Sequence, residues 1–199
     1  MDTLQQLGLA MGSAWTSGIN LYATVAALGL AHASGMIELP PGLHPLAHPL
    51  VITVALVLYV VEFFADKVPF LDNIWDAVHT FVRPVGAAAL GYVIAGETAD
   101  FGSAVGAVIS GSLALASHSA KATTRAAVNT SPEPFSNIFL SVAEDGLVAG
   151  LVALAIANPA ITLIVVVVLT VGAVWLTVKL FGIIRRFRSR WAAKKAAGT

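Results

Sequence analysis

The sequence contains no cysteine and unusually few charged residues. Cysteine is absent from all 199 residues, and only 11% of the residues are charged. Without cysteine there is no disulfide bond, no thiolate metal ligand and no thiol nucleophile. A soluble domain usually carries about 25% charged residues, so this chain lacks the polar side chains to cover a surface that faces water. Together with 57% hydrophobic residues, the composition predicts an all-α integral membrane protein.

Basic residues are also absent from the N-terminal stretch MDTLQQLGLAMGSAW. A secretory signal peptide begins with a positively charged region. We therefore expect this stretch to be the start of the first helix, retained in the mature protein.

Long apolar runs predict a bundle of about six transmembrane helices in a single domain, residues 1–184. A spanning helix needs about 20 apolar residues to cross a hydrocarbon core of about 30 Å. The predicted spans cover residues 7–31, 49–64, 84–96, 101–122, 134–157 and 160–184. The second and third are short, so either they extend into the polar segment between them, or that segment, 68–83, forms a short amphipathic or re-entrant helix.

The basic residues predict the orientation. The segment 185–199 contains RRFRSRWAAKK and forms a basic cytoplasmic tail, because cytoplasmic segments carry an excess of Lys and Arg. Six spans then place the N-terminus in the cytoplasm as well. The outer segment 32–48 has no Lys or Arg; its three histidines have no carboxylate at ligand spacing and are interpreted as loop residues, with metal capture as the alternative. We expect the tail to contact membrane lipids, not nucleic acid.

The segment 62–83 concentrates charge beside an apolar run. Its polar face carries Asp72, Asp76, His79 and Arg83. Steps of four, three and four residues place side chains on one face of a helix. A charge at the centre of a spanning helix costs at least about 2.5 kcal/mol, so such residues usually face a cavity, a pathway or each other.

Three further helices carry polar stripes, which leave two interpretations open. Small polar residues in a spanning helix allow close packing, and charged stripes of both signs form internal salt bridges. The alternative is a substrate or ion pathway. The predicted pathway-lining residues are Ser17, Asn20, Thr24, His118 and Ser141. The predicted substrate and coupling residues are Glu62, Asp66, Lys67, Asp72, Asp76, His79, Arg83, Lys121, Arg125, Glu133, Asn137, Glu144 and Asp145, of which Glu62, Asp66, Asp72 and Asp76 are candidate metal ligands.

A weak internal repeat is compatible with a 3+3 inverted arrangement, a common plan in transporters. Gly-Ser pairs occur at 12–13 and 111–112, and deep glutamates occur in the second and fifth predicted spans. Faces of small residues, such as 86–91, pack closely in membranes and are compatible with a homo-oligomer.

Three segments resemble a known family. SGINLYATVAALGL, EFFADKVPFLDNIWDAVHTFVRPVGAAALG and NTSPEPFSN are similar to bacterial membrane proteins classified as domain of unknown function 4126. The resemblance implies a bacterial inner-membrane protein but no activity. The E-x-x-x-D-K element also looks loosely like acidic motifs of small divalent-cation transporters, and the proline- and arginine-bearing helix looks like re-entrant helices of lipid-carrier flippases.

The leading functional hypothesis is a secondary transporter of a small metal or organic cation, coupled to protons or another ion. The alternative is a transporter, flippase or sensor of an anionic lipid or phosphorylated carrier, because arginine suits phosphate. An ion channel or a structural assembly protein is a further alternative. We expect no enzyme and no cofactor, because no serine elbow, zinc motif or nucleotide loop is present.

Overall fold

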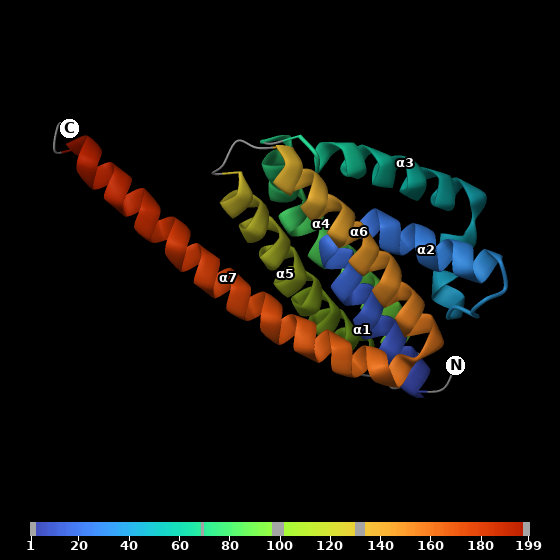
Figure 1. Cartoon of the computed structure of the whole chain (residues 1–199). Helices are drawn as coiled ribbons and strands as arrows, with labels where there is room; N and C mark the ends of the chain where they lie inside the picture. The colour runs from blue at the N-terminus through green and yellow to red at the C-terminus, as the bar shows by residue number, and fades with distance from the viewer. Residues whose placement is uncertain (1–2, 69, 97–101, 130–133, 197–199) are drawn as a thin grey trace.

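The computed structural model describes residues 3–68, 70–96, 102–129 and 134–196, without the side chains of Pro134 and of residues 187–196 (Figure 1). These residues form only helices, which confirms the all-α prediction. The helices are α1 (Thr3–Ile19), α2 (Leu21–Ala33), the 3-10 helix η1 (Pro41–Ala47), α3 (Pro49–Ala65), α4 (Leu71–Gly96), α5 (Gly102–Val128), α6 (Pro134–Ala157) and α7 (Pro159–Ala196).

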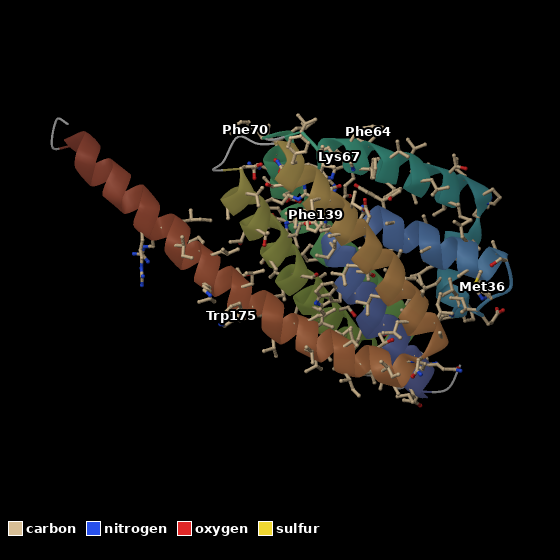
Figure 2. The ribbon with its side chains drawn as sticks, viewed as in Figure 1. Met36, Phe64, Lys67, Phe70, Phe139 and Trp175 are labelled. Atoms are coloured by element: carbon tan, nitrogen blue, oxygen red, sulfur yellow. The ribbon has the colours of Figure 1, made fainter. Side chains whose placement is uncertain are left out.

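Several helices are suited to cross a membrane. Leu71–Gly96, Phe135–Ala157 and Pro159–Arg186 are long and apolar enough to span one, and η1 with α3, which meet at 65°, could form a fourth span. Large apolar side chains, including Phe64, Phe139 and Trp175, point away from the bundle (Figure 2). These features support a membrane protein, but they do not confirm six complete spans.

The first predicted span, 7–31, is wrong as a single helix, because the chain reverses at Asn20. Asn20 has an extended backbone, and its side chain accepts a hydrogen bond from Ala23 N, which caps the start of α2. The hydroxyls of Thr16 and Thr24 are 3.0 Å apart. In one straight helix, eight residues would separate their backbones by about 12 Å along the axis. α1 and α2 therefore form a helical hairpin with its tip at Asn20.

The hairpin gives the bundle two distinct ends. At the loop end, Leu9 near the start of α1 shares a core cluster with Leu28, Leu39 and Ile94. The opposite, charged end holds the turn between α3 and α4 and the facing ends of α5 and α6. In Figure 1 the N-terminus lies at the loop end, whereas α7 runs from that end to a C-terminus far from it. The prediction that both termini lie on one side rests on six complete spans, of which three or four are supported by the length and composition of the described helices.

Of the two alternatives for the segment 68–83, a separate short helix is wrong and extension of the third predicted span is correct, because α4 continues through Pro84. An interior proline removes one helical hydrogen bond and costs about 3 kcal/mol. The buried face nevertheless runs unbroken across it. Its members are Asp72, Asp76, His79, Arg83, Ala87, Leu90 and Ile94. Contacts along this whole face offset the local cost, so the polar segment and the apolar segment are one helix.

Small residues set the close approach of α4 and α5. A Cβ atom added to Gly91 would lie 2.5 Å from the Gly106 carbonyl oxygen, and one added to Gly106 would meet the Gly91 carbonyl oxygen just as closely. No side chain fits at such distances. The contact fixes α4 against α5 and thereby sets the positions of their polar faces nearer the charged end.

The remaining predictions have mixed outcomes. The predicted span 134–157 coincides with α6, and the predicted boundaries of the helix at 49–64 differ from α3 by one residue. The basic segment after residue 184 continues α7 as a helix to Ala196. An inverted repeat is not confirmed, since α5 runs from Gly102 to Val128 with no break of the kind seen at Asn20.

The hairpin predicts which positions share a side of the membrane. Because the chain has no cysteine, single cysteines at Thr3, Ser34 and Val68 can be labelled in intact cells with a membrane-impermeant maleimide. We expect Thr3→Cys and Ser34→Cys to react from the same side and Val68→Cys from the other. A single straight span over 7–31 would instead place Thr3 and Ser34 on opposite sides, and that labelling pattern would exclude the hairpin.

Candidate functional site

A network of buried charged side chains lies between the hairpin tip and the charged end. Four helices and one turn supply its members. They are Glu62 from α3, Asp66 from the turn, Asp72, Asp76 and Arg83 from α4, Lys121 and Arg125 from α5, and Glu144 from α6. Each of these residues is at most 8% exposed. We call this set the ion network.

Arg83 joins α4 to α3 within the network. Its Nη2 lies 2.7 Å from Glu62 Oε1, and its Nη1 lies 3.1 Å from Asp76 Oδ1. Arg83 and Asp76 are seven residues apart, two turns of α4, so they lie on one face. The guanidinium thus holds the end of α3 against the middle of α4.

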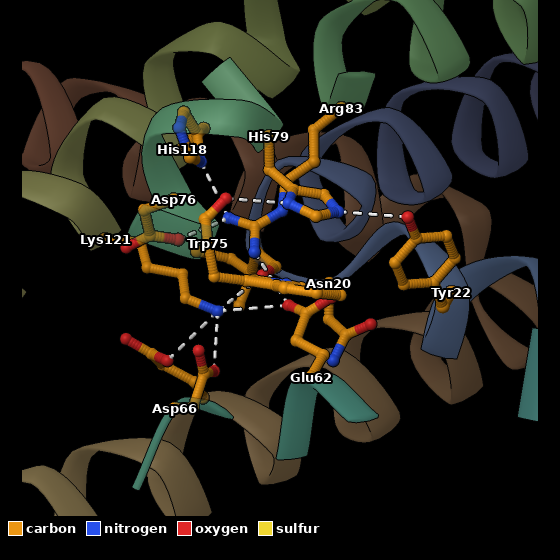
Figure 3. Close-up of polar contacts among 12 residues, drawn as sticks. Asn20, Tyr22, Glu62, Asp66, Trp75, Asp76, His79, Arg83, His118 and Lys121 are labelled. Carbon is orange, nitrogen blue, oxygen red and sulfur yellow. Dashed lines mark hydrogen bonds and ion pairs between the residues drawn. The ribbon is translucent and has the colours of Figure 1, made fainter. Parts of the chain in front are cut away.

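Lys121 has three carboxylate neighbours (Figure 3). Its Nζ lies 2.8 Å from Asp66 Oδ2, 3.2 Å from Glu62 Oε1 and 3.6 Å from Glu144 Oε2. Figure 3 shows the lysine side chain reaching between the carboxylates of Glu62 and Asp66. One ammonium group therefore connects α5 with three other parts of the chain.

Arg125 closes the network toward the charged end. Its Nη2 lies 2.5 Å from Glu144 Oε2 and 3.2 Å from Asp66 Oδ2, and its Nη1 donates to the Asp66 carbonyl oxygen. Asp72 Oδ2 is farther, at 3.9 Å. Asp72 instead accepts two hydrogen bonds of 2.9 Å from the Asn129 amide, whose oxygen accepts from Asn137.

The network has more negative than positive groups. Five carboxylates face three cationic side chains, so two negative charges are in excess when all groups are ionised. Lys67 and Asp145, which lie beside the network and are half-buried, add one charge of each sign and leave the excess unchanged. Burying unbalanced charge is costly. The network therefore calls for protons or bound cations.

Some carboxylate oxygens of the network have no hydrogen-bond partner among the described residues. Three of them are Glu62 Oε2, Asp66 Oδ1 and Asp76 Oδ2. Buried acceptors without a partner cost about 1–3 kcal/mol each, and more when charged. These oxygens are the places where a proton, a cation or a water would be stabilised.

The hairpin tip adds backbone oxygens to the same site. The carbonyl oxygen of Ile19 lies 3.0 Å from Lys121 Nζ, and that of Gly18 lies 3.4 Å from Arg83 Nη1. These are the last residues of α1, where carbonyl groups have no helical partner and the helix dipole is negative. The broken helix therefore supplies hydrogen-bond acceptors to the side chains of Arg83 and Lys121, which an unbroken helix over 7–31 would not.

Two histidines border the network on α4 and α5. His79 lies 3.0 Å from the Tyr22 hydroxyl through Nε2 and 2.7 Å from the Trp75 carbonyl through Nδ1. His118 lies 2.7 Å from Arg83 Nη1 through Nδ1 and 3.0 Å from the Thr80 hydroxyl through Nε2. His118 thus accepts from Arg83 as a neutral ring, and Asp76 pairs with Arg83, not with His79.

Lys67 lies at the edge of the network, in the turn between α3 and α4. Its Nζ donates to Phe63 O and to Ser141 Oγ, both at 3.0 Å, and lies over the Phe63 ring. Partial burial lowers the pKa of Lys67, and the Asp145 carboxylate opposes this shift. Lys67 is therefore a half-exposed cation beside the buried set.

The structure brings together most of the predicted site residues, with exceptions. Glu133 lies outside the described residues. Asn20 caps α2, and Ser17 is buried with no partner for its hydroxyl among the described residues. The candidate metal ligands Glu62, Asp66, Asp72 and Asp76 do not form a metal-binding group in the described chain, because Arg83, Lys121 and Arg125 lie between them.

Sequence reasoning missed several contributors. The contribution of the Gly18 and Ile19 carbonyls cannot be predicted from side chains, because these are backbone groups, and Tyr22 and Thr80 belong to no recognisable motif. It also found no carboxylate at ligand spacing for the histidines of the outer loop, whereas His32, Glu38 and His44 lie together at the loop end. The spacing of 32, 38 and 44 follows no helical period, so only the folded loop reveals it.

The fold and site define a helical membrane protein with a buried ion network beside a broken helix. The sequence pattern of the family described as "Domain of unknown function (DUF4126)" matches residues 7–179, and the chain belongs to this family. No curated protein and no solved structure was found to match the chain.

The excess negative charge predicts unequal effects of removing acids and bases. With all groups ionised, Lys121→Met leaves an excess of three negative charges, whereas Asp76→Asn leaves an excess of one. We expect Lys121→Met to cost about 3–5 kcal/mol, as for other broken buried pairs, and Asp76→Asn clearly less. Thermal unfolding of the purified protein in detergent, followed by tryptophan fluorescence, measures both.

A double variant keeps this prediction testable if Lys121→Met folds poorly. Adding Glu62→Gln removes one of the carboxylates that the lysine neutralised, so Lys121→Met/Glu62→Gln should unfold at a higher temperature than Lys121→Met alone. Equal losses for Lys121→Met and Asp76→Asn, with no recovery in the double variant, would show that the network is electrically balanced.

Proposed function

We propose that the protein is a secondary transporter in which a small cation and protons compete for the ion network. The observation that carries this proposal is the excess of two buried negative charges, located where carboxylate oxygens lack partners. A site with this charge favours binding of positive species. Intramembrane ionisable residues generally mark ion or proton pathways.

The unpaired oxygens indicate how coupling would occur. With no cation bound, protons on the carboxylates reduce the excess charge. A cation that contacts Glu62 Oε2 or Asp66 Oδ1 compensates the same negative charge as those protons, so binding of the cation releases them. Lys121 lies between the same two carboxylates, at 3.2 and 2.8 Å, and as a tethered cation it opposes the binding of additional cations at the site.

The hairpin supports a transport function. Many transporters bind their substrates near the middle of the membrane, at helices broken so that backbone dipoles face the ion. Here α1 ends against Arg83 and Lys121, near the middle of α4 and in the second half of α5. We propose no enzymatic reaction.

We propose that the charged end faces the cytoplasm of a bacterial inner membrane. Lys67 and Arg125 lie at that end, and the basic residues after 184 lie on the part of α7 farthest from the loop end (Figure 1); cytoplasmic segments carry such an excess. The hairpin then places the start of α1 on the outer side.

The coupling proposal predicts cation-driven proton movement. In proteoliposomes with a trapped pH dye, we expect addition of one of Na⁺, K⁺, Mg²⁺, Mn²⁺ or an organic cation such as ethidium to drive proton release from the opposite side. Glu62→Gln should reduce this flux by at least about tenfold, because one contact to a charged group contributes about 1.5–3 kcal/mol.

The matched control is Lys179→Gln, which removes a charge from the exposed face of α7; it should retain the flux. No proton movement with any of these cations, or full movement in Glu62→Gln, would contradict the proposal. Cation flux that follows the membrane potential without proton exchange would indicate a channel instead.

A second candidate function rests on a lateral cavity. A space of about 450 Å³ between α1, α5, α6 and α7 is lined by apolar side chains such as Trp15, Val168 and Leu176. Its polar members include Lys121 and Glu144, which belong to the ion network. An apolar chamber with charged groups in its wall suits an amphiphile, with its anionic head at Lys121 and its chain among the apolar residues.

Filling the cavity tests this second candidate. Gly172 lines it and has no atom within 4 Å of an added Cβ, so Gly172→Leu should fill the space without displacing the backbone. We expect co-purified anionic lipid, measured by native mass spectrometry, to fall by at least about tenfold, since each buried CH₂ contributes about 0.8 kcal/mol. Gly182→Leu, on the same helix outside the cavity, is the control. Equal lipid content in both variants would exclude the amphiphile.

A further inference from the structure

Three potential metal ligands meet at the loop end, away from the ion network. His32 lies near the end of α2, Glu38 in the connection that follows, and His44 in η1. Their ligand atoms all lie within 4.8 Å of one another, and among the described residues this is the group of potential metal ligands that meets this condition. No Lys or Arg occurs between residues 32 and 48 to occupy the carboxylate.

The distances match donors arranged around one small ion. Glu38 Oε1 lies 3.2 Å from His44 Nε2, and Glu38 Oε2 lies 4.0 Å from His32 Nδ1. Two ligands bound tetrahedrally to Zn²⁺, each at about 2.0–2.1 Å, are separated by about 3.3 Å. The two imidazole rings are stacked, with centroids 4.6 Å apart. Small side-chain rotations therefore suffice to point all three donors at one ion.

The loop that carries these ligands is anchored in the core. Leu39 and Leu43 are 1% and 5% exposed and belong to the same core cluster as Leu9 and Ile94. The turn before them is fixed by Gly35, whose φ of 76° suits glycine. Because the backbone is held in place, an ion would bind without first having to order the loop.

The imidazoles also contact the loop backbone. His32 Nδ1 lies 3.1 Å from the Ile37 carbonyl oxygen, and His44 Nε2 lies 2.8 Å from that of Leu39. His32 Nδ1 also accepts a long hydrogen bond of 3.4 Å from Leu39 N, which an ion bound at Nδ1 would replace, with the carbonyl oxygens beside it. The exposed sides of Glu38 and His44 admit water as a further ligand.

We propose that His32, Glu38 and His44 form a binding site for Zn²⁺ or a similar borderline transition-metal ion at the loop end. Two imidazoles and one carboxylate suit such ions, whereas Mg²⁺ and Ca²⁺ prefer oxygen ligands. The ion connects the end of α2 to η1 and so clamps the connection between the hairpin and α3. This site uses no residue of the ion network and does not depend on the proposed transport.

Zinc binding to the purified, tag-free protein tests the site. Titration of ZnCl₂ against a chromophoric chelator should show one competing site in the wild-type protein. His32→Ala, Glu38→Gln and His44→Ala should each weaken it by at least about tenfold. X-ray absorption of the zinc-loaded protein should show imidazole scattering at about 2.0–2.1 Å.

His48→Asn is the matched control. His48 lies in the same loop but caps α3 through Leu50 N, and asparagine can replace this cap. We expect this variant to bind zinc as the wild type does. Absence of a competing site, equal weakening in His48→Asn, or undiminished binding in a His32→Ala/Glu38→Gln/His44→Ala variant would overturn the proposal, the last by placing the ion elsewhere.

Discussion

The architecture depends on neutralising charge where water is scarce. Lys121 contacts Glu62, Asp66 and Glu144 and also holds the Ile19 carbonyl oxygen, so one ammonium group touches α1, α3, α5, α6 and the turn after α3. Small and apolar residues make up most of the rest of these elements, and their contacts alone would allow one helix to slide along its neighbours. The ion pairs give them a register, because a charge displaced by one turn would lose its partner at a cost of several kcal/mol.

The helical stripes made much of the site predictable from the sequence. Asp72, Asp76 and Arg83 do share one face, as spacing indicated. Arg83 contacts His118 from the stripe at 118–125, and that stripe pairs with the one at 137–144 through Arg125 and Glu144. The face also continues through Ala87 and Leu90 to Ile94. Following it past Pro84 would have predicted α4 as one helix, since a continuous buried face outweighs a single proline.

The hairpin was not predictable in the same way. The run from residue 7 to 31 has the length and apolar character of an ordinary span, and Asn20 looked like one member of a polar stripe. What reverses the chain is a set of distant contacts: Arg83 and Lys121 bind carbonyl groups that exist as free acceptors only if the helix ends at Ile19. Backbone acceptors leave no trace in a residue pattern. The grouping of His32 with His44 was missed for a related reason, since only the folded loop brings them together.

The hairpin also has a consequence for the order of events during synthesis. Its tip leaves the ribosome early, yet the groups that hold it, Arg83 and Lys121, follow 65 and 102 residues after the carbonyls they bind. Until α5 has been made, the Ile19 carbonyl oxygen lacks its Lys121 partner. The first segment to enter the membrane is therefore among the last to reach its final position, and a chain stopped before α5 would keep an unanchored N-terminal half.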